Sequence, residues 1–248
     1  MANTVVELFA GMGSISKVFW EKGYKVSLAV ESDKYACQIF SHNLPDVNVI
    51  ENELTNIEPM NIPASDILVS KLPMSIPRNP DNQNSLFIKH ILDIVAVKKP
   101  KVILFECVKR LLVSREFSFD LILKRLKNLG YSVVYKLMNA RDYTNLPYDR
   151  EKIYIIGFKD TMLYNAFSFP EVKSSNKSLL DIINIREKKA DVYYKSAAVR
   201  FLDKRMFNEE YLIYRRTYKK GFETYKDICP PLNGLYADYL VRDDHGIR

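Results

Sequence analysis

The apolar positions of residues 4–158 fall into two alternating patterns. Short apolar runs, typical of buried strands, lie at 4–10, 25–30, 47–50, 66–69, 101–105, 131–138 and 153–158. Apolar residues recur with helical spacing between them, at 14–22, 33–43, 85–98 and 117–128. Strands that alternate with helices build a mainly parallel sheet covered on both faces, so the pattern predicts an α/β fold. The last two runs have no helical segment between them, which predicts an antiparallel pair.

The periodicity weakens after residue 158. This part of the chain is rich in Lys, Arg and Tyr, and it contains turn signals such as Cys229-Pro230-Pro231. We therefore predict a sheet-containing domain over 1–165 and a smaller, irregular region over 166–248.

Length and charge narrow the classes of function. A chain of 248 residues suits one large domain, or one domain with a small appendage. The 37 Lys and Arg exceed the 30 Asp and Glu, which gives a net charge of +7. This excess fits a nucleic acid partner, although a solvated basic surface would produce it as well.

The cysteines and the apolar runs indicate a cytoplasmic protein without a metal site. Cys37, Cys107 and Cys229 match neither metal-ligand spacing nor a disulfide framework, which favours a reducing compartment. The chain does not open with a basic segment and an apolar run, so we expect no signal peptide. No apolar stretch approaches the ~20 residues of a membrane helix, so we expect no membrane span.

A glycine-containing turn follows the first predicted strand. The strand leads into Gly11-Met12-Gly13 and then into a helix, whose first N–H groups can bind a ligand. The next strand ends at Glu31, where a carboxylate can accept the hydroxyls of a ribose. This order is general to nucleotide-binding folds, but Ser16 stands where a dinucleotide fingerprint needs a third glycine. An ordinary tight turn and a surface acid are the alternatives.

Several further segments follow one family pattern in the same order along the chain. They are Phe9-Ala10-Gly11-Met12-Gly13, Glu31, Glu53-Leu54-Thr55, Asn84-Ser85-Leu86-Phe87, Phe105-Glu106-Cys107-Val108, Asn139-Ala140-Arg141, Tyr148-Asp149-Arg150-Glu151-Lys152, Tyr214-Arg215-Arg216 and Cys229-Pro230-Pro231-Leu232. Together they resemble bacterial cytosine-5 DNA methyltransferases, over essentially the whole chain. The resemblance implies a Rossmann-like methyltransferase fold with a mixed sheet, mostly parallel and with an antiparallel last strand, followed by a small target-recognition region.

The resemblance implies S-adenosylmethionine as the cofactor. The residues that it assigns to cofactor binding are Phe9, Gly11, Gly13, Glu31, Glu53, Pro73 and Leu86. Glu53 stands where the family usually has Asp, a conservative departure.

The resemblance also assigns the chemistry. The family adds a thiolate to C6 of a cytosine flipped out of duplex DNA, which lets C5 accept the methyl group. Glu106 would contact the N3 edge of the base, and Arg150 would hold the base. The residues that we expect to contact DNA are Lys71, Arg78, Lys152, Arg215 and Arg216.

The loop that carries the family's nucleophile departs from its pattern. The family's Pro-Cys-Gln reads Pro73-Met74-Ser75, and a thioether cannot form the attacking thiolate. Ser75 has no His nearby in the sequence to activate it. Cys107 follows Glu106 and should point to the opposite face of its strand, as a small buried residue. We therefore expect neither residue to replace the missing cysteine.

The leading hypothesis is a DNA (cytosine-5-)-methyltransferase polypeptide of a restriction-modification system, impaired or inactive alone. Because the chain stops at Arg248, before the family's ninth and tenth motifs, we expect a second polypeptide to supply them. One alternative is a non-catalytic module that keeps the fold to bind DNA or a partner chain. Another is a nicotinamide dehydrogenase, which Ser16 and the lack of a substrate domain disfavour.

Overall fold

The structure is a computed structural model. It describes residues 3–72, 83–113, 119–173, 177–182, 213–217, 221–225, 227–229, 239–243 and 246–247. The chain divides into two compact units, Met1–Leu137 with Lys152–Phe169, and Met138–Glu151 with Pro170–Arg248. The second unit thus includes a segment, Met138–Glu151, that the periodicity did not separate from the sheet. The domain boundary at residues 165 and 166 stays a prediction.

A seven-stranded sheet with the order β3-β2-β1-β4-β5-β7-β6 organises the first unit. Its strands are β1 (Thr4–Leu8), β2 (Lys25–Glu31), β3 (Val49–Glu51), β4 (Ile67–Lys71), β5 (Val102–Val108), β6 (Ser132–Asn139) and β7 (Glu151–Phe158). The strands from β3 to β5 pair in parallel, whereas β7 runs antiparallel to β5. The prediction of a mostly parallel sheet with an antiparallel last strand is therefore confirmed.

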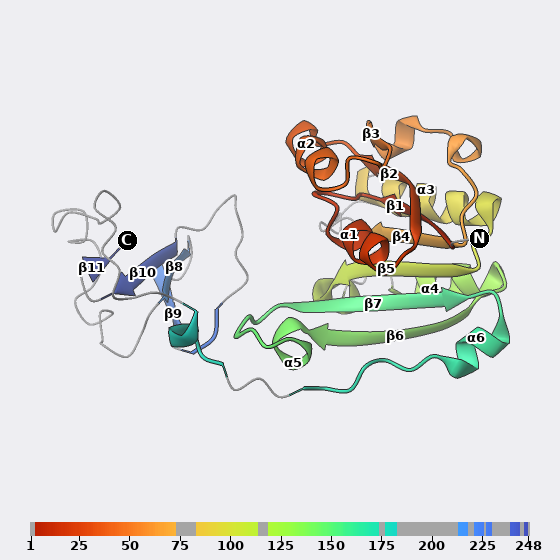
Figure 1. Cartoon of the computed structure of the whole chain (residues 1–248). Coiled ribbons are helices and arrows are strands. Elements are labelled where there is room, and N and C mark those ends of the chain that lie inside the picture. The colour runs from red at the N-terminus through yellow and green to blue at the C-terminus, as the bar shows by residue number, and fades with distance from the viewer. Residues whose placement is uncertain are drawn as a thin grey trace. The chain divides into compact units, whose positions relative to one another are not determined.

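Helices cover both faces of this sheet (Figure 1). The helices of the first unit are α1 (Ser14–Glu21), α2 (Lys34–Asn43), α3 (Gln83–Lys98), α4 (Phe119–Asn128) and α6 (Thr161–Ala166), and α5 (Ala140–Tyr143) belongs to the second unit. Short 3-10 helices are η1 (Leu54–Asn56), η2 (Pro59–Asn61), η3 (Lys109–Val113) and η4 (Leu179–Asp181). The four predicted helices correspond to α1 to α4, which confirms the helical pattern.

The core consists of two clusters of buried apolar side chains, one on each face of the sheet. Phe40 of α2 and Leu44, which follows that helix, pack with Val5 and Val69 on one face. The other cluster joins the strands to α3 and α4, and it includes Ile91. Burial of these apolar side chains is the main term that stabilises the fold.

Strand alternation directs three charged side chains to the α1/α2 face. Glu7 lies two residues after Val5, and Lys71 lies two residues after Val69, so each shares the face of its predecessor. Glu106 of β5 is the parallel-sheet neighbour of Lys71. Because β4 lies between β1 and β5, charged groups from three adjacent strands meet near their carboxyl ends, where ligands bind in open α/β sheets.

The second unit contains a four-stranded sheet with the order β11-β10-β8-β9. Its strands are β8 (Ile213–Thr217), β9 (Gly221–Tyr225), β10 (Tyr239–Asp243) and β11 (Gly246–Ile247), and each pairs antiparallel with its neighbours. The region is thus more regular than its sequence indicated, because charged and polar residues interrupt the apolar positions of β8, β9 and β10 and leave no long apolar run.

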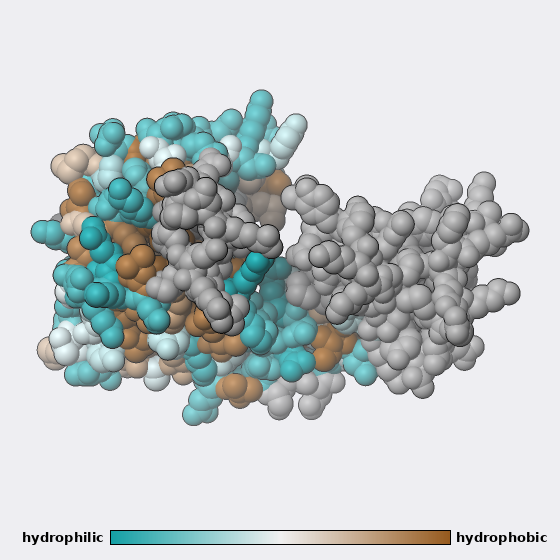
Figure 2. All heavy atoms as spheres, turned by 180° about the vertical axis from the view of Figure 1, so that it is seen from behind, coloured by the Kyte–Doolittle hydropathy of each residue, from teal (hydrophilic) through white to brown (hydrophobic). Residues whose placement is uncertain are grey.

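None of the helices in the described ranges is long and apolar enough to cross a bilayer. Figure 2 shows hydrophilic side chains interspersed with smaller apolar areas over the described part of the visible face. The cytoplasmic location stays a prediction.

Candidate functional site

The turn between β1 and α1 is built from residues in left-handed backbone conformations. Gly11 has φ 58° and Gly13 has φ 84°. The Gly13 N–H donates to the Ala10 carbonyl over 3.1 Å, and the Gly13 carbonyl accepts from Lys17 at the start of α1. A Cβ at position 13 would lie 2.6 Å from Cδ2 of the buried Phe40. Only glycine therefore fits position 13, both in backbone angle and in space.

Phe9 enters this turn with a positive φ of 55°, which is uncommon for a bulky residue. Its ring packs edge-on against Phe87 of α3, with centroids 5.2 Å apart. Leu86, the predicted cofactor contact, is 51% exposed, whereas Phe87 is buried. Strained backbone of this kind concentrates at functional sites, which is consistent with a ligand site at the turn. The sequence did not indicate Phe87 as the residue that supports Phe9.

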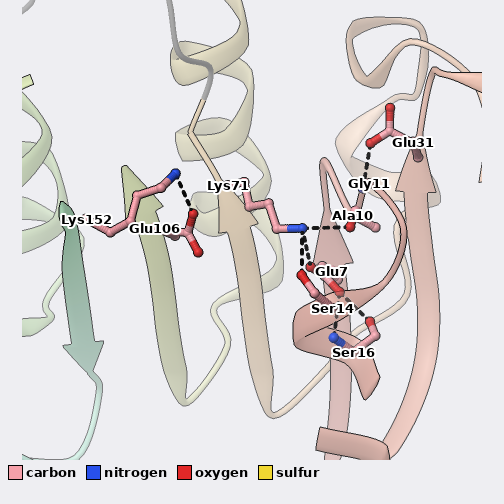
Figure 3. A network of polar contacts seen from close by, with 9 residues as sticks. All are labelled: Glu7, Ala10, Gly11, Ser14, Ser16, Glu31, Lys71, Glu106 and Lys152. Atoms are coloured by element: carbon pink, nitrogen blue, oxygen red, sulfur yellow. Dashed lines mark hydrogen bonds and ion pairs between the residues drawn. The ribbon is translucent and has the colours of Figure 1, made fainter. Parts of the chain in front are cut away.

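The carboxylate of Glu31 is tied to the same turn. Oε2 accepts the Gly11 N–H over 2.7 Å (Figure 3). Oε1 accepts the N–H groups of Ser32 and Asp33, each over 2.9 Å. Three of about four acceptor positions are then used by the backbone, and one on Oε2 is left for a ligand hydroxyl. Glu31 thus both orders the turn and presents an acceptor beside it.

Glu53 lies close to this end of the sheet. It precedes η1, and its carbonyl accepts the N–H of Asn56. The N–H of the preceding Asn52 donates to the Glu31 carbonyl over 3.0 Å. The structure therefore brings the Glu53 segment beside Glu31, as the predicted cofactor site requires.

A buried carboxylate lies beneath the turn. Glu7 is fully buried, and its Oε2 accepts hydrogen bonds from the N–H and the hydroxyl of Ser16. Its Oε1 lies 3.7 Å from Nζ of Lys71. Burial raises the pKa of Glu7 above its ordinary value, while Ser16 and Lys71 act in the opposite direction. A charged residue inside an apolar strand was the sequence signal for this group.

Lys71 reaches from the end of β4 to the turn. Its Nζ donates to the Ala10 carbonyl over 2.8 Å and to the Ser14 hydroxyl over 3.3 Å (Figure 3). Contact of Lys71 with DNA phosphate stays a prediction, whereas in this structure its ammonium contacts the turn.

Glu106 and Lys152 form an ion pair on neighbouring strands β5 and β7. Nζ of Lys152 lies 2.7 Å from Oε1 of Glu106, and the two side chains are 14% and 16% exposed (Figure 3). A partly buried pair with this geometry holds the Glu106 carboxylate in one orientation. Lys152, predicted to contact DNA, instead directs its charge to Glu106 in this structure; its contact with DNA stays a prediction.

Arg150 belongs to the second unit. Its Nη1 donates to the hydroxyl of Tyr148 over 2.9 Å, and its guanidinium lies 6.0 Å from the centre of that ring. The side chain of Asn139 accepts the Arg150 N–H over 3.0 Å, and the Arg150 carbonyl accepts from Ala140. The segment is therefore held by hydrogen bonds at both backbone groups of Arg150.

Comparison with known proteins decides the family. The model of the family described as "C-5 cytosine-specific DNA methylase" matches residues 3–227. The chain belongs to this family. The type II methyltransferase M.Bsp6I of Bacillus sp. (strain RFL6) is 32% identical over 98% of the chain and 82% of that protein. M.BsuFI of Bacillus subtilis is 35% identical over 73% of the chain, but the match spans only 45% of that protein.

Solved structures agree on the fold of this C-5 cytosine methylase family member. A DNMT2 variant from Spodoptera frugiperda has a TM-score of 0.63 at 20% identity, over 77% of the chain and 61% of that protein. The Dnmt2 methyltransferase of S. pombe has a TM-score of 0.65 at 14% identity, over 82% of the chain and 66% of that protein. The Rossmann-like methyltransferase fold is therefore confirmed.

The family's cofactor is S-adenosylmethionine, and the residues of the turn fit its adenosyl part. A carboxylate acceptor at Glu31, an open glycine turn and the backbone of the Glu53 segment lie together at the carboxyl ends of β1 and β2. The two ends of the turn, at Ala10 and at Ser14, are both contacted by the ammonium of Lys71.

The remaining predicted site residues lie in the segment after β4 and in β8. Pro73, Met74 and Arg78 lie outside the described residues. Arg215 and Arg216 lie in β8 of the second unit. Their roles stay predictions.

Cys107 points away from Glu106, into the α3/α4 cluster, which confirms the expectation of a small buried residue. Burial raises the pKa of its thiol to about 12.

We expect Cys107 to stay unmodified when the folded chain is treated with iodoacetamide at about pH 8, because the thiolate is the reactive form. Mass spectrometry of the folded and urea-unfolded chain measures this. Labelling of Cys107 in the folded chain would contradict it.

Proposed function

We propose that this chain binds S-adenosylmethionine and a flipped cytosine as a DNA (cytosine-5-)-methyltransferase polypeptide of a restriction-modification system. We further propose that Met74 leaves it unable to begin methyl transfer. One observation carries the proposal. Lys71 of β4 contacts the glycine turn after β1, and its neighbour across the sheet is Glu106 of β5. The glycine turn after β1 and the carboxylate of Glu106, which can bind the edge of a base, therefore lie on either side of β4.

Different residues of the site would bind the two ligands, the cofactor and the cytosine. S-adenosylmethionine would supply the methyl group, and Glu31 would accept a hydroxyl of its ribose. Glu106 would bind the N3 edge of cytosine, and Lys152 would keep that carboxylate oriented. Arg150, which Tyr148 holds by a hydrogen bond, would stabilise the base.

The missing step is addition to C6 of the base. In the family a cysteine thiolate provides it, and a methionine thioether has no proton to lose. The buried, high-pKa Cys107 on the opposite face of β5 offers no substitute. Binding can therefore survive where methyl transfer does not.

We expect the unmodified chain to transfer no label from methyl-tritiated S-adenosylmethionine to duplex DNA. Met74→Cys should raise incorporation above background, since it restores a thiol that can ionise. The matched control is Met74→Cys with Glu106→Gln, which keeps the thiol and should lose most of the gain. Transfer by the unmodified chain at the rate of Met74→Cys would contradict the proposal.

A second polypeptide with the family's ninth and tenth motifs stays a prediction. The same transfer assay, run with and without the product of the neighbouring reading frame, tests it. A gain that requires this product supports a split enzyme.

A non-catalytic module is the other candidate, and Met74 favours it. Calorimetry with duplex DNA and with adenosyl ligands distinguishes the methyltransferase polypeptide from the non-catalytic module. Binding of duplex DNA without binding of any adenosyl ligand would support the module and reject the cofactor site.

A further inference from the structure

Lys71 places a positive charge inside the glycine turn. Its ammonium donates to the Ala10 carbonyl and to the Ser14 hydroxyl, which belong to opposite ends of the turn. A Cβ added at Gly11 would lie 3.4 Å from Nζ, so the ammonium lies directly against the backbone of the turn. The side chain is 27% exposed, which is low for a lysine at a strand end. Figure 3 shows it extended from β4 toward β1 and away from Glu106.

The buried carboxylate of Glu7 holds the charge in this position. Within the described part of the chain, Oε1 of Glu7 accepts no hydrogen bond, and Nζ of Lys71 lies 3.7 Å from it. A buried carboxylate is costly unless a cation or hydrogen-bond donors compensate it. Lys71 supplies that compensation and is itself fixed by it. The ammonium is therefore a built part of the turn.

We propose that Lys71 makes the cofactor site discriminate against S-adenosylmethionine and in favour of S-adenosylhomocysteine. The inference rests on the proposed function, since it assumes an adenosyl ligand beside Glu31. S-adenosylmethionine carries a sulfonium charge that S-adenosylhomocysteine lacks, and the two ligands are otherwise alike except for one methyl group. Like charges repel most where solvent is partly excluded, as it is at Lys71.

The adenosyl part of the site is separable from this effect. Glu31 acts through the N–H groups of Gly11, Ser32 and Asp33, whereas Lys71 acts on Ala10, Ser14 and Glu7. Adenosine, which has no charged tail, should therefore report on the Glu31 side alone.

Calorimetry of the whole chain with the three ligands tests the proposal. We expect the unmodified chain to bind S-adenosylmethionine about tenfold more weakly than S-adenosylhomocysteine. Lys71→Met removes the charge and should reduce this ratio to about two or less, with the affinity for adenosine changed less than about twofold. Lys71→Gln removes the charge but keeps hydrogen-bond donors, and it should give the same ratio.

The control is Lys17→Met. Lys17 lies on α1 just after the turn, is partly exposed, and pairs with Glu21 on the surface. Lys17→Met removes the same net charge without changing a side chain that contacts the turn. The ratio of the affinities for S-adenosylhomocysteine and S-adenosylmethionine should therefore stay at the value of the unmodified chain.

Two results would overturn the inference in distinguishable ways. Equal affinities of the unmodified chain for the two ligands, or a ratio that persists in both Lys71 variants, would reject the role of Lys71 and leave the cofactor site intact. Failure of all three ligands to bind any folded form of the chain would reject the cofactor site, and the proposed function with it.

Discussion

Gly13→Ala is expected to lower the free energy of unfolding by about 3 kcal/mol, as the sum of two effects. A left-handed conformation such as φ 84° costs a non-glycine residue about 1–2 kcal/mol. The added methyl group would also lie 2.6 Å from Cδ2 of Phe40, a fully buried ring that cannot move without disturbing its cluster, and overpacking of this kind costs about 1–3 kcal/mol. Urea unfolding measures the loss. The single Trp, Trp20, lies in α1 directly after the turn and reports the transition by fluorescence.

Gly23→Ala is the matched control. Gly23 has nearly the same φ, 81°, but a Cβ there would meet no atom within 4 Å. It therefore isolates the backbone effect, and we expect a loss of about 1 kcal/mol. Adding Phe40→Leu to Gly13→Ala should give a coupling of about 1 kcal/mol, because the ring that clashes is then smaller. Equal losses for the two glycine variants would show that contact with Phe40 contributes nothing.

Glu31→Gln is expected to weaken the binding of S-adenosylhomocysteine about 100-fold, or about 2.7 kcal/mol. Hydrogen bonds to a charged acceptor contribute about 1.5–3 kcal/mol, and the amide of Gln offers one oxygen in place of two. That oxygen cannot serve the N–H groups of Gly11, Ser32 and Asp33 together, so the turn also loses order. Calorimetry with S-adenosylhomocysteine measures the change without the charge effect proposed for Lys71.

Glu51→Gln provides the comparison. Glu51 is the register partner of Glu31 on β3, and its side chain is exposed. The variant makes the same change of charge one strand away from the turn, and we expect less than a twofold effect. Retained affinity in Glu31→Gln, with a normal unfolding transition of Trp20, would remove Glu31 from the cofactor site.

Lys71 and Met74 lie within a few residues of each other, and they have separate consequences. Met74 concerns the start of the reaction, whereas Lys71 concerns which adenosyl ligand the turn prefers. The assays keep them apart, because one measures transfer of label and the other measures binding.

The local sequence was enough to predict the main elements of the first unit. Strands and helices were recognised because their apolar positions repeat with different periods, which is a property of neighbouring residues. The places of Gly11, Gly13 and Glu31 were also predictable, since a turn after the first strand and an acid at the end of the second are defined within about thirty residues of chain. The strands β8, β9 and β10 of the second unit lack this signal, because charged and polar residues interrupt their apolar positions.

The α/β fold, the glycine turn, the acid at Glu31 and the methionine at position 74 could all be recognised in the amino-acid sequence. The partners of the charged groups could not. Lys71 joins Glu7 and Ala10 across more than sixty residues of sequence, and Lys152 joins Glu106 across 46. These pairs form because of the order of the strands in the sheet. Periodicity shows that strands exist, whereas the packing of helices on both faces decides that β4 lies between β1 and β5 and so which charges meet.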